Sequence, residues 1–284
     1  TKSQSETLEE VRGYADLYFE TDRESRQTLS STLLIIGPTG TGKSTIVDTL
    51  AHTLNASKFR MTPADLVPVG AGSHVASTRA ALAEKIVGNR KIILHIDELD
   101  KLYNYEGSEW TRSIQTEVLG ILERRVDWQK VVGGLKRSFR GSNQGLSKVD
   151  HQSLDLWFKQ NVFIVGSGTW QELYRKKTNN ENKCPIGFNP NSDEDRSSGE
   201  DEKMSREMIR QSGEIPEEIL RRFHSEVLPL HYPDLDETDQ ILQKRGLYEL
   251  AKKAGEELKA EDICWDKIGG LSKINDLKTE LMVK

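Results

Sequence analysis

Nine residues early in the chain have the types and the spacing that bind phosphate groups. Residues 37–45 read Gly-Pro-Thr-Gly-Thr-Gly-Lys-Ser-Thr, which fits the pattern G-x-x-x-x-G-K-[ST]. The apolar residues 33–36 before them predict a buried strand, and residues 46–54 after them have helical spacing. A glycine-rich turn between a strand and a helix points backbone N–H groups and the helix N-terminus at a polyphosphate. The motif therefore predicts a phosphate-binding loop, or P-loop.

The positions of this loop have separate physical roles. Its glycines let the backbone approach a phosphate closely, Lys43 can reach the β- and γ-phosphates, and the Ser44 hydroxyl can bind magnesium. The alternative, a glycine-rich turn that fits by chance, loses weight because strand, helix and a second motif accompany it. We expect ATP and Mg²⁺ as cofactors. The expected binding residues are Gly37, Pro38, Thr39, Gly40, Thr41, Gly42, Lys43, Ser44 and Thr45.

Two carboxylates at the end of a second apolar stretch could carry out hydrolysis. Residues 92–98 read Ile-Ile-Leu-His-Ile-Asp-Glu, so Asp97 and Glu98 follow a predicted buried strand. Ligands of α/β sheets bind at the carboxyl ends of the strands. We expect Asp97 to help position Mg²⁺ through its water shell and Glu98 to polarise the attacking water as a general base. A strand that ends in a solvated acidic turn is the alternative, and the P-loop upstream argues against it.

Strands and helices must alternate to position these two motifs. The sequence predicts strands at 33–36, 58–61, 91–96 and 161–166, and helices at 43–54, 75–87, 109–124 and 169–176. Such alternation indicates an α/β fold, in which a parallel sheet lies between helices. Residues 5–30 are expected to be helical and amphipathic. After Pro233 the composition is helical, with one helix that starts at 235 and contains Leu247 and Ala251, and a second helix at 271–282.

We therefore divide the chain into an N-terminal helical segment (1–30), an α/β core (31–232) and a small helical lid (233–284). Two segments interrupt the core. Residues 178–212 include an acidic, Ser- and Asn-rich stretch that predicts a flexible surface loop. Residues 130–150 are Gly-rich and basic, and they are either a solvated face or a surface that contacts nucleic-acid phosphates or an acidic protein.

Composition narrows the class of protein. The 284 residues are 35% hydrophobic, enough for one α/β domain with a small appendage. No apolar run approaches the ~20 residues of a membrane helix and no signal peptide is evident, so we expect a cytoplasmic protein with no membrane partner. Cys184 and Cys264 stand alone, which argues against a disulfide framework or a zinc site. A net charge of −5 argues against nucleic-acid binding driven by bulk charge, but allows a local basic surface.

The motifs make nearly the whole chain resemble the AAA+ ATPases. Within that superfamily it looks most similar to the branch of the Clp- and Hsl-type unfoldases and the MoxR-type ATPases. Residues 37–44 resemble the unfoldase P-loop and residues 96–101 resemble their "IDEIDK". Residues 114–123 resemble the helix "VQxxLLxxLEG", and residues 215–223 resemble the arginine-finger element "PEAxLDRF". The resemblance implies an AAA+ P-loop core with a C-terminal helical lid and ATP hydrolase activity.

The resemblance also implies an arginine that completes a neighbouring site. Alignment of residues 215–223 with the family puts Arg222 in the place of the arginine finger, with Arg221 as the alternative. Such an arginine reaches the γ-phosphate held by the next subunit and stabilises charge in the transition state. A surface arginine at a helix end is the other interpretation. A finger arginine implies a homo-oligomer, and we expect a ring, with a filament as the alternative.

Two sensor positions follow from the same resemblance. Thr169 takes the place of the polar sensor that contacts the γ-phosphate or the attacking water, with Ser167 as the alternative. The usual asparagine is absent, and Thr169 could instead cap the next helix. In the lid, Lys273 is the cation nearest to the second sensor position, and another alignment puts Ser272 there. The lid is short for the family, which leaves truncation of the chain open.

The sequence says less about the molecule on which this ATPase acts than about ATP binding. Residues 66–72 correspond to the pore loop of the unfoldases, where Pro68 replaces the aromatic residue that grips an extended chain. We expect an oligomeric, chaperone-like ATPase that remodels a protein complex, with a protein substrate or adaptor as its partner. One alternative is a nucleic-acid-associated ATPase, such as a loader, an initiator or a transposition regulator, which binds through 130–150. The other is an ATP-gated assembly platform.

Overall fold

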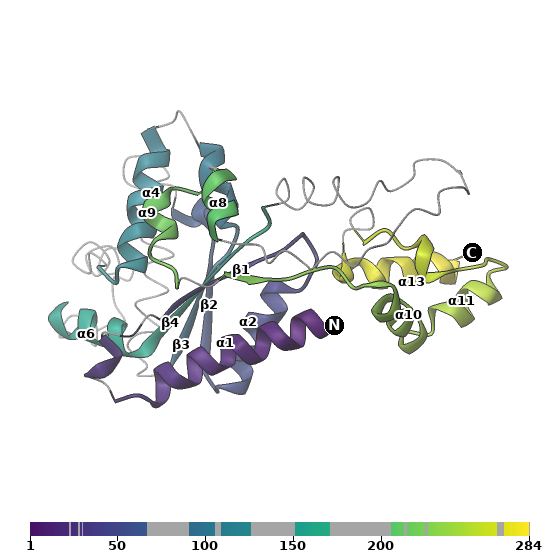
Figure 1. The fold of residues 1–284 in the computed structure, drawn as a ribbon, viewed down its shortest axis with the longest axis horizontal. Coiled ribbons are helices and arrows are strands. Elements are labelled where there is room, and N and C mark those ends of the chain that lie inside the picture. Colours follow the sequence, from purple (N-terminus) through teal and green to yellow (C-terminus); the bar gives the residue numbers. More distant parts are fainter. Residues whose placement is uncertain are drawn as a thin grey trace, which may run out of the picture.

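The computed structural model describes an α/β core and a cluster of C-terminal helices, which lie at opposite ends of the molecule (Figure 1). Several expected features lie outside the described residues: the helix at 75–87, residues 171–176 of the helix expected at 169–176, all but the first residue of the pore loop, the basic segment 130–150 and most of the acidic segment. Residues 169 and 170, which are described, are not helical. The described residues are 1–22, 24–27, 29, 31–66, 91–105, 109–125, 151–170, 206–212, 215–224, 227–265 and 270–283.

Within the described residues, five strands form one parallel sheet in the order β2-β3-β4-β1-β5. Strands β1, β3 and β4 are buried along their whole length, as expected for a parallel sheet covered by helices on both faces. The prediction of an α/β core with a parallel sheet is confirmed. The strands are β1 (Thr32–Ile36), β2 (Ser57–Met61), β3 (Ile92–Ile96), β4 (Val162–Gly168) and β5 (Val227–Pro229).

Alternate residues of the strands face two different hydrophobic layers. In β1, Leu33 and Ile35 pack with helices α1 and α2, whereas Leu34 and Ile36 pack with α4 and α9 on the other face. Figure 1 shows these helices on the two sides of the sheet. The helices of the core are α1 (Lys2–Glu20), α2 (Lys43–Thr53), α4 (Glu109–Leu122), α6 (His151–Asn161), α8 (Arg206–Ser212) and α9 (Glu217–Leu220), with 3₁₀ turns at Ser25–Gln27, Pro63–Leu66 and Leu99–Tyr105.

The C-terminal helices have a hydrophobic core of their own. Leu242, Leu247, Trp265 and Ile274 are among its buried residues, and the Trp265 indole donates to the Thr238 hydroxyl at 2.9 Å. Among the described helices, none has both the length and the apolar composition needed to cross a membrane. The C-terminal elements are α10 (Leu235–Lys244), α11 (Leu247–Lys253), α13 (Ile274–Val283) and 3₁₀ turns at Ala260–Asp262 and Leu271–Lys273.

Two expected helices end earlier than the sequence predicted. Helix α1 stops at Glu20 rather than continuing to 30, because Thr21 is extended and the Asp22 carboxylate accepts the Ser25 N–H at 3.0 Å in a side-chain-stabilised turn. The helix expected from 235 through Ala251 is two helices, because Gly246 takes a left-handed conformation with φ 68° between α10 and α11.

Other boundaries also differ from the predictions. Helix α6 directly precedes β4 and was not predicted, so residue 161 ends a helix instead of starting a strand, and β4 runs on to 168. Helix α8 occupies 206–212, which were expected to belong to the flexible loop 178–212. Residues 271–273 form a 3₁₀ turn before α13 rather than the first turn of the expected helix. Helices α6 and α8 lie next to or within the two segments that interrupt the core, where the hydrophobic period is weak.

Candidate nucleotide-binding site

The phosphate-binding motif forms the turn between β1 and α2, as its sequence context predicted. Gly40 and Gly42 have φ of 80° and 95°, which residues with a side chain rarely adopt. A Cβ on Gly42 would also lie 2.3 Å from the Gln4 amide nitrogen, which donates to the Thr41 carbonyl at 2.7 Å. The loop is therefore held both by its own backbone and by the first turns of α1.

Lys43 is the first residue of α2, and its side chain folds back into the loop. It is only 8% exposed, and its ammonium donates to the carbonyl oxygens of Gly37 and, at 2.8 Å, Pro38. Burial lowers the pKa of Lys43 to about 8, although the negative charges of Asp97 and Asp100 act in the opposite direction. Among the described residues, carbonyl oxygens of the loop thus accept the hydrogen bonds of the Lys43 ammonium.

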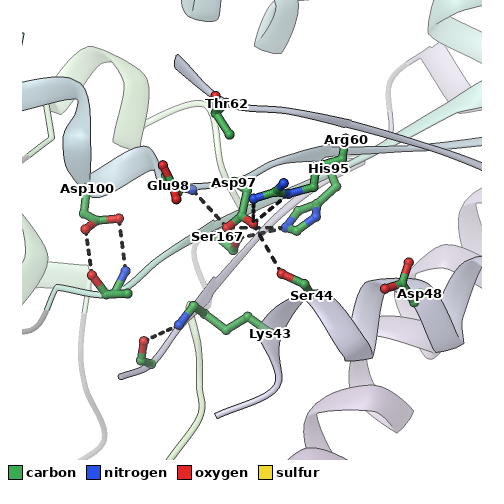
Figure 2. A network of polar contacts seen from close by, with 12 residues as sticks. Lys43, Ser44, Asp48, Arg60, Thr62, His95, Asp97, Glu98, Asp100 and Ser167 are labelled. Carbon is green, nitrogen blue, oxygen red and sulfur yellow. Dashed lines mark hydrogen bonds and ion pairs between the residues drawn. The ribbon is translucent and has the colours of Figure 1, made fainter. Parts of the chain in front are cut away.

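Asp97 follows β3 and links the P-loop to two neighbouring strands (Figure 2). One oxygen, Oδ1, accepts the Ser167 hydroxyl at 2.6 Å and the Glu98 N–H at 3.0 Å. The other, Oδ2, accepts from the Ser44 hydroxyl at 3.3 Å and from Arg60 Nε at 3.0 Å. Burial acts to raise the pKa of Asp97, but the hydrogen bond from Ser167 and the nearby cations hold it below its ordinary value. Asp97 is therefore an ionised, fully hydrogen-bonded carboxylate.

His95 supports Asp97 from inside the sheet. It is fully buried, and its Nε2 lies 2.8 Å from the Ser167 hydroxyl oxygen. Because Ser167 gives its only proton to Asp97, we infer that His95 Nε2 carries a proton and donates it to Ser167. Burial lowers the pKa of His95 to about 4, so the ring is neutral near pH 7. Its Nδ1 is buried and has no hydrogen-bond partner among the described residues.

Glu98 and Asp100 point to different neighbours. Glu98 has a left-handed backbone with φ 60°, and its carboxylate, whose side chain is 41% exposed, pairs with Lys101 at 2.8 Å. Asp100 accepts the Thr169 N–H at 3.1 Å and the Thr169 hydroxyl at 2.7 Å. A left-handed non-glycine residue costs on the order of 1 kcal/mol, and such residues cluster at functional sites. Of the two acidic residues that follow Asp97, Glu98 thus pairs with Lys101, whereas Asp100 holds Thr169 after β4.

Comparison with known protein families supports this geometry. The model of the family AAA, "ATPase family associated with various cellular activities", matches residues 33–185, more than half of the chain. The match runs from β1 past β4 and so includes both the P-loop and Asp97. The chain belongs to the AAA ATPase family. Membership in this family implies nucleotide binding.

The donor atoms of this AAA protein fit magnesium. Mg²⁺ prefers oxygen ligands and is usually bound by one or two carboxylates together with water and substrate phosphates. The Ser44 hydroxyl and the Asp97 carboxylate supply oxygens 3.3 Å apart. Within the described part of the chain, no cluster of three or more His, Cys, Asp or Glu side chains could form an all-protein metal cage. The arrangement therefore suits a metal that arrives together with a nucleotide.

The structure separates Arg222 from the P-loop of its own chain. The Thr32 hydroxyl, at the start of β1, donates to the Arg222 carbonyl, whereas the P-loop follows Ile36 at the other end of that strand. At ~3.3 Å per residue these ends are about 13 Å apart. The Arg222 guanidinium pairs with Glu123, at 2.8 Å from Nε to Oε1, and Arg221 pairs with Glu217 at 2.7 Å. The AAA protein thus presents Arg222 away from its own candidate site.

The C-terminal helices meet the P-loop at one short segment. The Leu271 N–H donates to the Gly40 carbonyl at 3.0 Å, and a Cβ on Gly270 would lie 2.6 Å from the Thr39 carbonyl oxygen. Tyr232 adds a hydrogen bond from its hydroxyl to the same Thr39 carbonyl at 2.9 Å. Lys273 lies two residues after Leu271, but it is exposed and pairs with Asp276 at 3.0 Å. The side chain of Ser272 is not among those described.

Sequence reasoning missed four side chains in this site: Gln4, Arg60, His95 and Asp100. His95 stood in the motif 92–98 without a role. Gln4 is distant in sequence and reaches Thr41 only because α1 packs beside α2. Arg60 was an unremarkable residue of an expected strand, and only the pairing of β2 with β3, which sets Arg60 opposite His95, brings it to Asp97. Asp100 stood in the quoted motif without a role. The sequence did contain one signal for Arg60: it is a basic residue in the predicted strand that comes before the strand ending at Asp97.

Proposed function

We propose that the protein is a magnesium-dependent ATP hydrolase that works as a homo-oligomer and uses hydrolysis to remodel a protein complex. The observation that carries the proposal is the meeting of Ser44 from the P-loop with Asp97 from the acidic strand, 3.3 Å apart at one edge of the sheet. Hydrolysis needs a phosphate-binding loop and a magnesium-positioning carboxylate at the same place, and these two residues are the ones expected to supply them.

The P-loop would bind the triphosphate. The backbone N–H groups of residues 37–45 and the start of α2 supply donors for phosphate oxygens. Lys43 now rests on carbonyl oxygens, and it can exchange them for β- and γ-phosphate oxygens without leaving the loop. Ser44 and Asp97 would hold magnesium, directly and through water respectively. The bound metal would supply charge neutralisation for the phosphates.

Glu98 would act as the general base. Its backbone is left-handed and its side chain is 41% exposed, so water can reach the carboxylate. Lys101 holds the carboxylate at 2.8 Å in the resting structure. Thr169 and Ser167 are candidates for sensing the γ-phosphate. Of the two, Ser167 donates to Asp97, so it is the better placed to report changes at the metal side.

Arg222 of one subunit would complete the site of the next. The distance along β1 argues that Arg222 does not serve its own nucleotide, and its side chain is 42% exposed where a neighbour could approach. An arginine supplied in trans contributes about 10³–10⁵ in rate by stabilising transition-state charge. Activity would then depend on assembly, which favours a ring or a filament over a monomer.

The lid would convert hydrolysis into motion. Gly270 and Leu271 contact the P-loop backbone directly, and the lid packs around its own hydrophobic core. A change in the loop on loss of phosphate can therefore rotate the C-terminal helices as one body. Lys273 is two residues beyond the contact and would reach the nucleotide only after releasing Asp276.

A protein target is the better supported of the two target classes. The net charge of −5 disfavours a generic nucleic-acid binder, and the motifs resemble those of the Clp-, Hsl- and MoxR-type machines. The basic residues of 130–150 favour nucleic acid as the second candidate.

An ATPase assay separates these targets. The rate of the purified chain is measured alone, with single- or double-stranded DNA, and with an unfolded protein. We expect stimulation by protein. Stimulation by DNA that disappears in a Lys136→Gln, Arg137→Gln, Arg140→Gln variant would replace the remodelling proposal with the nucleic-acid one. Failure to bind or hydrolyse ATP under any condition would overturn both.

A further inference from the structure

Arg60 makes a contact with Asp97 that the proposed reaction does not use. It lies in β2, and both its Nε (3.0 Å) and Nη2 (2.9 Å) approach the same carboxylate oxygen, Oδ2. The Arg60 side chain is 50% exposed, whereas that of Asp97 is 10% exposed. Figure 2 shows the guanidinium and the Ser44 hydroxyl both directed at Asp97, with Ser167 near its other oxygen. The Arg60 guanidinium is therefore already bound to the carboxylate that we propose positions magnesium.

The acceptor capacity of Asp97 makes this contact competitive. A carboxylate oxygen has about two lone-pair positions. On Oδ1 they are taken by the Ser167 hydroxyl and the Glu98 N–H, both held by the strands. On Oδ2 they are taken by Ser44 and Arg60. Ser44 belongs to the P-loop and is itself proposed to bind the metal. The position on Oδ2 that remains for a metal-bound water is therefore the one that Arg60 fills.

We propose that Arg60 is a built-in counter-ion of Asp97 that competes with magnesium. In the nucleotide-free protein Arg60 keeps Asp97 ionised and oriented. When a magnesium nucleotide binds, the guanidinium leaves Oδ2 and returns to water. This inference rests on the proposed function of the P-loop and Asp97, and it makes Arg60 a positioning residue that sets how much magnesium the site requires.

The physical cost of this exchange is small enough for it to be reversible. Half of the Arg60 side chain is already in solvent, so its release needs little additional exposure. The Asp97 side chain is only 10% exposed, but the positive charge of the arriving magnesium replaces that of the guanidinium. The Arg60 charge opposes a divalent cation a few ångströms away, an effect attenuated by solvent. Removing it should lower the magnesium concentration needed for half-maximal nucleotide binding by about three- to tenfold.

Lys58 provides a matched control. It lies two residues before Arg60 on the same strand and pairs with opposite residues of β3 in the same register. Its ammonium pairs with Asp48 at 2.6 Å rather than with Asp97. Lys58→Gln therefore removes the same charge from the same strand without changing the hydrogen bonds of Asp97. A general electrostatic effect would change both variants equally, whereas competition at Oδ2 would change only the Arg60 variant.

The experiment is a magnesium titration of the binding of a fluorescent ATP analogue, for the wild type, Arg60→Gln, Arg60→Lys and Lys58→Gln. We expect the magnesium midpoint to fall three- to tenfold in Arg60→Gln. It should fall at least about twofold in Arg60→Lys, which keeps the charge but loses the two-nitrogen contact, and by less than about twofold in Lys58→Gln. The analogue affinity at saturating magnesium should be unchanged. Thermal melts without nucleotide check that each variant is folded.

Several outcomes overturn the inference. A wild-type or higher midpoint in folded Arg60→Gln would do so, and so would equal shifts in Arg60→Gln and Lys58→Gln. Weaker analogue binding at saturating magnesium in Arg60→Gln would assign Arg60 to the phosphates instead. If the wild type binds no nucleotide at any magnesium concentration, the proposed function itself fails, which is a different result from an unchanged midpoint. Should Arg60→Gln not fold, the Arg60→Lys midpoint decides.

Discussion

Both ends of the parallel sheet carry an arginine, but the groups that bind its guanidinium differ between the two ends. At the carboxyl end, exposed Arg60 pairs with the Asp97 carboxylate. At the amino end, partly buried Arg124 donates to the Phe158 carbonyl at 3.0 Å and to the Ser31 hydroxyl, and its guanidinium lies 5.7 Å from the centre of the Tyr18 ring. Neutral carbonyl groups and aromatic faces hold the Arg124 guanidinium without a negative counter-charge, whereas the Asp97 carboxylate supplies a full negative charge, which Mg²⁺ also favours. The partner, more than the arginine itself, therefore distinguishes the two ends of the sheet.

The backbone at Arg124 reinforces this difference. Arg124 has φ 59° at the end of α4, and the hydrogen bonds Arg125 N to Gly120 O and Arg124 N to Ile121 O form a Schellman cap, where glycine is usual. The guanidinium contacts to α1, α6 and the start of β1 compensate for the left-handed conformation. The neighbouring Glu123 then holds Arg222, so the structural end of the sheet also carries the residue proposed to act on another subunit.

Arg222→Ala is the strongest test, because it asks whether the amino end has a catalytic role after all. We expect kcat for ATP hydrolysis to fall about 10³- to 10⁵-fold with nucleotide binding retained. Arg221→Ala, which removes an exposed residue paired with Glu217, should stay near wild type. Mixing Arg222→Ala with Glu98→Gln subunits should restore part of the activity, since a site with intact Glu98 can then meet an intact Arg222. Mixtures as inactive as either variant alone would contradict action in trans.

Glu98→Gln addresses the carboxyl end alone. The amide keeps the shape of the side chain but cannot accept the proton of the attacking water, so we expect kcat to fall about 10²- to 10⁴-fold. Binding of labelled ATP should persist, because Lys43, Ser44 and Asp97 are unchanged. Single-turnover and equilibrium-binding measurements separate the two quantities. Normal turnover in this variant would show that another group activates the water.

Arg124 should matter for stability and not for chemistry. Arg124→Ala leaves partly buried carbonyl groups without their charged donor and keeps a non-glycine residue in a left-handed position, so we expect the free energy of unfolding to fall by about 2–4 kcal/mol. Arg124→Gly should lose about 1 kcal/mol less, because glycine relieves the backbone. Denaturant unfolding measures both. A larger loss in Arg124→Gly than in Arg124→Ala would contradict the role assigned to the backbone.

A change spread over several pH units is expected from His95 at the carboxyl end. Its pKa falls from 6.5 to about 4 on folding because of burial. Between these values the unfolded chain binds more protons, so the free energy of unfolding rises with pH, by up to about 1.4 kcal/mol per unit. Stability should thus be lost as the pH falls from 6.5 toward 4. His95→Gln should remove this part of the slope, and parallel wild-type and variant curves would contradict the assignment.

The limits of sequence-based prediction can be seen in particular residues. The P-loop and Asp97 were predictable because strand, turn and helix are consecutive and the required residue types are rare in combination. The end of α1 at Glu20 was not, since the turn depends on hydrogen bonds from the Glu24 and Ser25 N–H groups to the Asp22 carboxylate, which compete with helical spacing. Helix α6 was missed because it follows a long glycine-rich insertion. Arg60, Gln4 and the Arg124 cluster depend on contacts between residues far apart in the chain.

The order of residues alone determined that this chain contains an α/β core with a P-loop, because short-range hydrogen bonding and hydrophobic period are local properties. It also determined that acidic residues follow a buried strand. Only the folded chain decided which side chains surround Asp97, which of Ser167 and Thr169 contacts it, and on which end of the sheet Arg222 lies. Those facts depend on strand order and register, which arise when distant segments pack to bury apolar surface.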